Sequence, residues 1–159
     1  MKKKYHSYDE ALSKLQAYCA YQERCHKEVR QKLRDLGIWG DDVDQIVTEL
    51  ITDNFLNELR YAKAFAGGKF RVKKWGKKRI IQALKFNYVS AYSIKKAIQS
   101  ELPDEEYDAT LRQVLEKKDK LLRESNPYKR RQKLAKYAQD KGFESALIWS
   151  ILNENPIKK

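Results

Sequence analysis

The chain has 159 residues, with 34 lysines and arginines against 22 aspartates and glutamates, and its net charge at pH 7 is +12. Hydrophobic residues make up 42% of it, which is enough to bury a core and excludes a wholly disordered chain. It has no run of about 18 apolar residues, and no apolar segment follows its basic start, so neither a membrane span nor a secretion signal is expected. We therefore expect a cytoplasmic protein that does not contact a membrane.

A first helix is predicted near the start of the chain. Ser7 and Glu10 form a capping-box pattern before apolar residues at helical spacing, which predicts a helix over about 8–22. Cys19 and Cys25 would lie about 9 Å apart along one helix at ~1.5 Å per residue, beyond the ~7 Å that a disulfide spans. We expect both to be reduced thiols.

Other capping signals lie further along the chain. Asn57 is a candidate N-cap, and the pair Gly67-Gly68 is expected to end the helix that follows it. Asn126 before Pro127 is the pattern of a cap with proline at the first helical position. No alternating strand pattern of useful length competes with these signals, so an all-α protein is predicted.

A pattern of five apolar residues occurs three times. The second set lies 51 residues after the first, and the third lies 54 residues after the second: Val29, Leu33, Ile38, Val43 and Val47; Ile80, Leu84, Val89, Ile94 and Ile98; Leu134, Ala138, Phe143, Ile148 and Leu152. In each set two pairs, each one helical turn apart, flank a break, as in a helical hairpin. Gly37 and Gly142 mark the break in the first and third copies, where a left-handed C-cap suits glycine. The second copy has Tyr88 there, and Asn87 beside it is the expected substitute.

These repeats predict the architecture. The first two hairpins are each followed by a further helix, over about 57–66 and 104–121, and the third copy ends where such a helix would start. We expect an elongated, curved array of three tandem three-helix repeats, the last one truncated, after an N-terminal helix. The expected boundaries are 1–22 for the N-terminal tail and leading helix, 23–67 and 68–122 for the first two repeats, and 123–159 for the truncated third repeat and C-terminal tail. A monomer is expected.

The positive charge is concentrated in the middle of the chain. No acidic residue occurs from Leu59 to Ser100, a stretch that carries twelve basic ones, whereas the other 22 basic residues are matched by the 22 acidic residues. Such a segment predicts an anionic partner, and a solvated lysine-rich helix face is the alternative. A second basic run lies between Lys117 and Lys136. The two are expected to form a stripe along successive repeats.

The candidate contact residues lie in these two segments. They are cations suited to bind phosphate or an acidic surface, together with one aromatic residue: Lys69, Arg71, Lys73, Lys74, Trp75, Lys77, Lys78, Arg79, Lys129, Arg130 and Arg131. Trp75 has two open roles, because it could be an apolar plug at the start of the second repeat or a platform on which a base stacks.

Residues suited to catalysis or metal binding are few. Cys25 and His26 are adjacent and would point different ways on a helix, so they do not predict a metal site. No Gly-rich phosphate loop is present. Asp41, Asp42 and Asp44 could hold Mg²⁺ in a nuclease, but carboxylates at the start of a predicted helix also act as caps and favour the helix dipole. We expect no enzyme activity, no cofactor and no metal.

One string of residues resembles a known family. Phe55-Leu56-Asn57-Glu58-Leu59-Arg60-Tyr61-Ala62-Lys63-Ala64-Phe65, followed by Trp75-Gly76 and later by Lys141-Gly142-Phe143, is similar to the RecX family of bacterial RecA regulators. The resemblance covers the chain from about Leu12 to Leu152. Asn57 departs from the acid that is usual there but keeps its capping ability, and Asn87-Tyr88 departs from the usual glycine.

The resemblance implies a non-enzymatic, all-helical protein of three tandem repeats that binds RecA. Family members lodge in the deep groove of the RecA filament on DNA, inhibit its ATPase and recombinase activities, and so modulate DNA repair and the SOS response. DNA, single- or double-stranded, is expected as a partner within the filament and as a weak ligand alone. The alternative is a stand-alone DNA-binding helical module whose hairpins act like helix-turn-helix units.

Overall fold

The computed structural model describes residues 5–154, and this part of the chain contains helices and no strands. The helices are α1 (Tyr8–Tyr21), α2 (His26–Asp35), α3 (Asp41–Thr52), α4 (Glu58–Arg71), α5 (Lys77–Phe86), α6 (Ala91–Glu101), α7 (Asp104–Leu121), α8 (Pro127–Asp140) and α9 (Ser145–Leu152). The prediction of an all-α chain is confirmed. None of the described helices is both long enough and apolar enough to cross a membrane.

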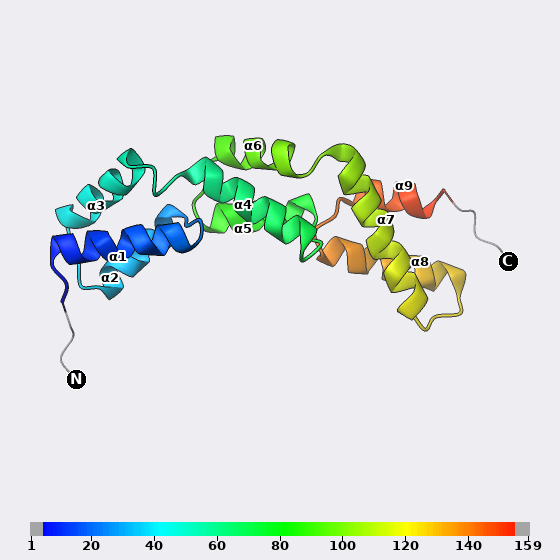
Figure 1. Cartoon of the computed structure of the whole chain (residues 1–159). Helices are drawn as coiled ribbons and strands as arrows, with labels where there is room; N and C mark the ends of the chain where they lie inside the picture. The colour runs from blue at the N-terminus through cyan, green and yellow to red at the C-terminus, as the bar shows by residue number, and fades with distance from the viewer. Residues whose placement is uncertain (1–4, 155–159) are drawn as a thin grey trace.

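The helices form an elongated, gently curved array (Figure 1). The helices α1, α2 and α3 lie at one end, α4, α5 and α6 in the middle, and α7, α8 and α9 at the other end. Within each group of three, successive helices pack on one another, and α4 also packs closely on α6. We call these groups the first, second and third units. The prediction of a tandem helical array is confirmed.

The expected repeat boundaries divide the same array differently. Breaks after residues 22, 67 and 122 start each repeat one helix later than the packing groups do. In a tandem array any helix of the repeat can be taken as its first, so those boundaries stay a prediction.

The repeated apolar pattern marks the buried face of six helices. Of its fifteen positions, twelve are buried, and the other three, Val43, Ile98 and Leu152, are partly buried and packed against a core. The pattern held because residues one helical turn apart share a face, so a constant spacing keeps the same face inward in every copy.

Two hydrophobic cores run through the described residues. One belongs to the first unit and includes Leu15 and Leu50. The other is continuous through the second and third units and includes Phe70 and Phe143. Cys25, the N-cap of α2, lies in this second core and so connects the first unit to it. The second and third units are therefore held together more extensively than the first and second.

The helix starts follow the sequence signals. The side chain of Ser7 accepts a hydrogen bond from the N–H of Glu10, whose carboxylate accepts one from the N–H of Ser7, so α1 has the predicted capping box. Asn57 caps α4, and Asn126 caps α8 with Pro127 in its first turn. The predicted starts of these helices are confirmed.

The prediction that Gly67-Gly68 ends α4 is wrong, because the helix continues to Arg71. Burial of Phe70 in its last turn, worth about 1.5–3 kcal/mol, outweighs the cost of about 0.5–1 kcal/mol for each helical glycine. The helix ends where Lys74 takes a left-handed φ of +58° and the N–H of Trp75 donates to the carbonyl of Lys69 at 3.1 Å.

The turn inside each hairpin contains a residue with positive φ. Gly37 has φ +82° and Gly142 has φ +102°, as predicted. In the second hairpin Tyr88 itself takes φ +59°. The prediction that Asn87 takes the left-handed conformation in place of glycine is therefore wrong. Asn87 has φ −90° and donates from its side-chain amide to the hydroxyl of Tyr61 at 3.1 Å. A contact with α4 thus fixes Asn87 and leaves the strained conformation to its neighbour.

The two cysteines are buried and neither forms a disulfide, so the prediction of reduced thiols is confirmed. The expectation that both lie on one helix is wrong, because Cys19 lies in α1 whereas Cys25 is the N-cap of α2. Burial raises the pKa of the Cys19 thiol to about 11, which keeps it protonated and unreactive.

Replacing Tyr88 by glycine is expected to raise the free energy of unfolding by about 0.5–1 kcal/mol, because a left-handed conformation is costly for any residue with a Cβ. Tyr88 is 79% exposed, so little packing is lost. Urea denaturation measures the change. Tyr92→Ala, which removes a similarly exposed ring from a helix, is the control. A destabilised Tyr88→Gly variant would contradict the explanation.

A backbone contact joins the second unit to the third. Helix α5 begins after Gly76, which has no side-chain cap, and carbonyls of the turn between α8 and α9 take the place of a cap. The N–H of Gly76 donates to the carbonyl of Lys141 at 2.8 Å, and the N–H of Lys78 donates to that of Gly142 at 3.0 Å. A Cβ at position 76 would overlap backbone atoms of Gly142 and Phe143. Glycine is therefore required for the two backbones to meet.

Two glycine substitutions should have opposite effects on stability. Gly76→Ala is expected to lower the free energy of unfolding by about 1–3 kcal/mol, because its methyl group overlaps backbone that cannot move aside. Gly68→Ala is the matched control. It lies within α4 facing open space, so it should raise stability by about 0.5–1 kcal/mol. Thermal melts of both variants test the pair, and equal effects would refute the role given to Gly76.

Candidate functional site

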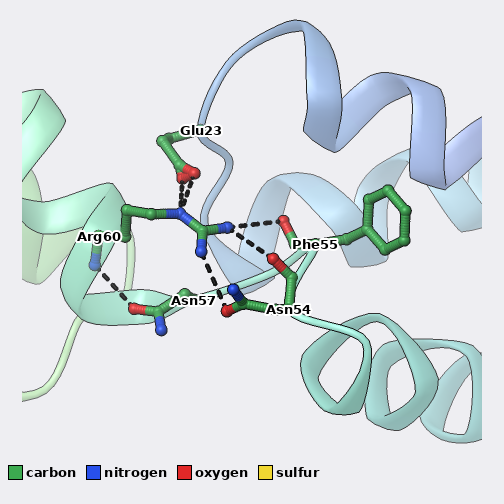
Figure 2. A network of polar contacts seen from close by, with 5 residues as sticks. All are labelled: Glu23, Asn54, Phe55, Asn57 and Arg60. Carbon is green, nitrogen blue, oxygen red and sulfur yellow. Dashed lines mark hydrogen bonds and ion pairs between the residues drawn. The ribbon is translucent and has the colours of Figure 1, made fainter.

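The side chain of Arg60 ties the first unit to the second (Figure 2). Its Nε donates to both carboxylate oxygens of Glu23, in the connection between α1 and α2. Its terminal nitrogens donate to the Asn54 side chain at 3.0 Å and to the carbonyls of Asn54 and Phe55 at 2.9 and 3.3 Å. Asn57 holds the backbone of Arg60 by accepting its N–H at 2.8 Å. One guanidinium thereby connects three separate segments.

Neighbouring residues of the same string also make structural contacts. The Glu58 carboxylate accepts hydrogen bonds from the N–H and hydroxyl of Ser90 and from the hydroxyl of Ser93. Burial opposes ionisation of Glu58, but these hydrogen bonds outweigh it and lower its pKa. Tyr61 and Ala62 are buried. The residues that carry the family resemblance therefore hold α4 to α6 within the second unit and, through Arg60, connect α4 to the first unit.

A buried tyrosine occupies the same position in the first turn of α4 and of α7. Tyr61 is the fourth residue of α4, and Tyr107 is the fourth residue of α7. The Tyr107 hydroxyl accepts the N–H of Lys77 at 3.0 Å and donates to the carboxylate of Glu144. Burial raises the pKa of both phenols, so both stay protonated. Sequence reasoning missed this pair, although a shared offset from the starts of α4 and α7 could have revealed it.

In the folded chain, carboxylates from other segments lie beside the stretch from Leu59 to Ser100, which we call the acid-free segment. Three of its twelve cations pair with carboxylates from elsewhere in the chain: Arg60 with Glu23, Arg71 with Glu101 at 3.6 Å, and Lys77 with Asp104 at 3.7 Å. Two predicted contact residues, Arg71 and Lys77, are thus partly neutralised within the fold.

Five other predicted contact residues have no carboxylate partner among residues 5–154: Lys69, Lys73, Lys74, Lys78 and Arg79. They lie from the last turn of α4 to the first turn of α5. Lys73, Lys78 and Arg79 are exposed. This stretch has the chemistry expected of a surface for anions.

Trp75 is half-buried, with its ring in contact with the core on one side and with cations on the other. Its ring packs edge-on against Phe65, with 6.4 Å between centroids, and it contacts the core of the second and third units. The Lys69 ammonium lies 4.9 Å and the Arg79 guanidinium 4.2 Å from its centroid. This packing favours the plug role, and base stacking stays a prediction.

The second basic run does not act as one surface. Arg130 pairs with Asp119 at 2.6 Å and donates to three backbone carbonyls around the end of α7, so its charge is used to close that helix. Arg131 donates to the Asn153 side chain at 3.1 Å. Lys129 is exposed. Of the three predicted contacts, Arg130 is mainly structural.

A cluster of cations forms where the second unit meets the third. The half-buried Lys141 ammonium donates to the carbonyl of Lys73 at 3.1 Å. Burial lowers the pKa of Lys141, and the positive charges of Arg79 and Lys117 lower it further. We call Lys73, Arg79, Lys117 and Lys141 the joint cluster. Lys117 and Lys141 were not among the predicted contact residues, because only the fold places them beside the acid-free segment.

The aspartates considered for a nuclease site lie at the start of α3. Asp41, Asp42 and Asp44 are exposed in its first turn, and Asp44 pairs with Arg30 at 2.9 Å. No group of three or more His, Cys, Asp or Glu residues that could hold a metal ion occurs within the described part of the chain. The N-cap of α3 is Gly40 and no side chain caps the helix, so the predicted capping role of these aspartates is wrong, whereas their place in the first turn fits the helix dipole.

Two family models match the chain over the second and third units. The model described as RecX, second three-helix domain, matches residues 57–98, and the model described as RecX, third three-helix domain, matches residues 104–152. The chain belongs to the RecX family. Its second and third units correspond to the second and third three-helix domains of RecX, and the resemblance drawn from the sequence is confirmed.

Curated relatives support this assignment along most of the chain. The Regulatory protein RecX of Thermotoga maritima is 28% identical over 134 residues, which cover 84% of this chain and 77% of the relative. That of Prosthecochloris aestuarii is 27% identical over 150 residues, which cover 91% and 92%. Membership of this family of regulatory proteins supports a regulatory role.

Solved RecX structures have the same fold. The structure of RecX from Lactobacillus salivarius superposes with a TM-score of 0.83 at 23% identity, over 92% of this chain and 95% of that one. Another structure, of a regulatory protein RecX, superposes with a TM-score of 0.82 at 20% identity, over 93% and 73%. The array of three-helix units is thus a RecX fold.

Arg60→Ala is expected to lower the free energy of unfolding by about 1–2 kcal/mol, because it leaves the Glu23 carboxylate and two carbonyls without their donor. The loss is smaller than for a fully buried pair because solvent screens both side chains. A double-mutant cycle with Glu23→Gln isolates the pair. Strict additivity of the two substitutions would contradict the coupling.

Proposed function

We propose that this RecX chain is a non-enzymatic regulator that binds RecA and lies in the groove of the RecA–DNA filament. There it inhibits the ATPase and recombinase activities of RecA and so modulates DNA repair and the SOS response. The chain acts in the cytoplasm as a monomer, with the DNA of the filament as its second partner.

The observation that carries this proposal is the extended RecX array with unpaired cations in its middle. An elongated stack of helices presents a long surface, which suits a polymer better than a small molecule. Lys73, Lys78 and Arg79 are exposed on it with no carboxylate partner among residues 5–154. A filament of protein on DNA offers both acidic protein surface and phosphate to such cations.

Inhibition follows from bridging. A chain that touches neighbouring RecA protomers restrains the movements that each protomer makes during the ATP cycle. The second and third units share one continuous core, so they can act as a stiff strut between two protomers. The exposed cations mainly raise the rate of encounter and make it sensitive to salt.

The triple variant Lys73→Ala, Lys74→Ala, Lys78→Ala tests the basic segment. Lys77 is left intact because it pairs with Asp104 and its backbone is bound by Tyr107. We expect the concentration needed to inhibit the DNA-dependent ATPase of RecA by half to rise about tenfold, since three charges that speed encounter are lost. A steady-state ATPase assay at low salt measures it.

The matched control is Lys85→Ala, Lys95→Ala, Lys96→Ala, which removes the same charge from exposed positions on α5 and α6. It should inhibit like the wild type. If both triple variants lose inhibition equally, net charge matters and the segment does not. A wild-type chain that binds naked DNA tightly, with a salt slope near −5 for about six phosphates, and leaves RecA unaffected would favour the stand-alone DNA-binding module.

A further inference from the structure

The joint between the second and third units brings together cations that are distant in sequence. Lys73 follows α4, Arg79 lies in the first turn of α5, Lys117 lies in α7 and Lys141 follows α8. The hydrogen bonds of Gly76 to the turn between α8 and α9 hold these segments against each other. The joint cluster therefore exists only where the second and third units are docked.

Positive charge in this cluster is not balanced within the fold. None of its four side chains pairs with a carboxylate in residues 5–154, although eleven ion pairs form elsewhere in that range. The Lys141 ammonium has only the Lys73 carbonyl as a hydrogen-bond partner there, at 3.1 Å. The Arg79 guanidinium reaches only the carbonyl of Asp140, at 3.5 Å. The positive charges of Arg79 and Lys117 repel the Lys141 ammonium, and a bound anion would relieve that repulsion.

Aromatic rings border the cluster on both units. Arg79 lies over Trp75, as described above. In the third unit, the Lys118 ammonium lies 4.8 Å and the Lys141 ammonium 5.7 Å from the centroid of the Tyr137 ring. These rings orient the cations without neutralising them, since a cation–π contact leaves the full charge in place.

We propose that the joint cluster is a phosphate-binding site that holds the backbone of DNA across the joint between the second and third units. The inference deepens the proposed function and rests on it for the source of the DNA. A single carboxylate of a protein partner would balance one of the four charges, whereas DNA presents a row of phosphates that can meet several of them. The guanidinium of Arg79 also suits the paired oxygens of a phosphate.

Binding at this place has a structural consequence. Arg79 belongs to the second unit, whereas Lys117 and Lys141 belong to the third. An anion that contacts both sides adds a link between the units and binds only the folded joint. DNA should therefore raise the melting temperature of the chain, by linkage between ligand binding and folding.

The test compares two double variants of the full chain that lose the same charge. Lys117→Gln with Lys141→Gln alters the joint cluster, and Lys95→Gln with Lys96→Gln alters exposed lysines of α6. Binding of a fluorescein-labelled oligothymidylate is measured by anisotropy, without RecA, at several salt concentrations. We expect the joint variant alone to bind about tenfold more weakly and to reduce the salt slope by about 1.4, the value for two phosphate contacts on a single strand.

Two further measurements test whether Lys117 and Lys141 contact phosphate. Lys141 also bonds to the Lys73 carbonyl, so circular dichroism checks folding, and Lys117→Gln alone, at an exposed residue, should reduce the slope by about 0.7. If the joint and α6 variants lose DNA affinity equally, or if neither loses it, the proposed site is wrong. Binding of inorganic tripolyphosphate but not of DNA by the wild type would overturn DNA as the ligand.

Binding of DNA and inhibition of RecA are measured separately. The same variants are assayed for inhibition of the RecA ATPase. A wild-type chain that does not inhibit RecA refutes the proposed function, whereas normal DNA binding by the joint variant refutes only the site. Loss of DNA-dependent thermal stabilisation in the joint variant, with stabilisation kept in the α6 variant, supports the link across the joint.

Discussion

The contact between the start of α5 and the turn before α9 determines the position of the third unit relative to the second. A helix N-terminus without a side-chain cap leaves backbone N–H groups that need acceptors, and the carbonyls of Lys141 and Gly142 supply them. Because these acceptors belong to the next unit, the first N–H groups of α5 are fully hydrogen-bonded only when the two units are docked. The continuous core and the joint cluster both depend on the close approach that Gly76 allows.

The joint between the first and second units is held by different interactions. There Arg60 meets Glu23 and the connection after α3, and the side chains on both sides are partly exposed. Apart from Cys25, the buried residues of the first unit form a core of their own. The two joints thus differ in kind: a charged side chain bridges one, and a backbone contact with a shared apolar interior forms the other.

Features set by local periodicity could be predicted from the sequence, and features set by contacts across units could not. The spacing of apolar residues located the buried faces, and Ser7, Asn57 and Asn126 located helix starts, because each signal acts within one or two turns. The end of α4 depends on the burial of Phe70. The neutralisation of Arg71 depends on Glu101, which follows the acid-free segment in the chain. Of the candidate surface, sequence reasoning therefore identified the central lysines but not the neighbours that balance or reinforce them.

The division of the apolar interior into two bodies gives the array an uneven stiffness. Bending between the second and third units would open a common core, whereas bending at Arg60 would disturb partly exposed hydrogen bonds and a single buried residue, Cys25. The connection at Arg60 is therefore the place where the array has less buried surface to resist bending. A change in the curvature of such an arc would therefore be concentrated at one connection and would leave the other two units unchanged.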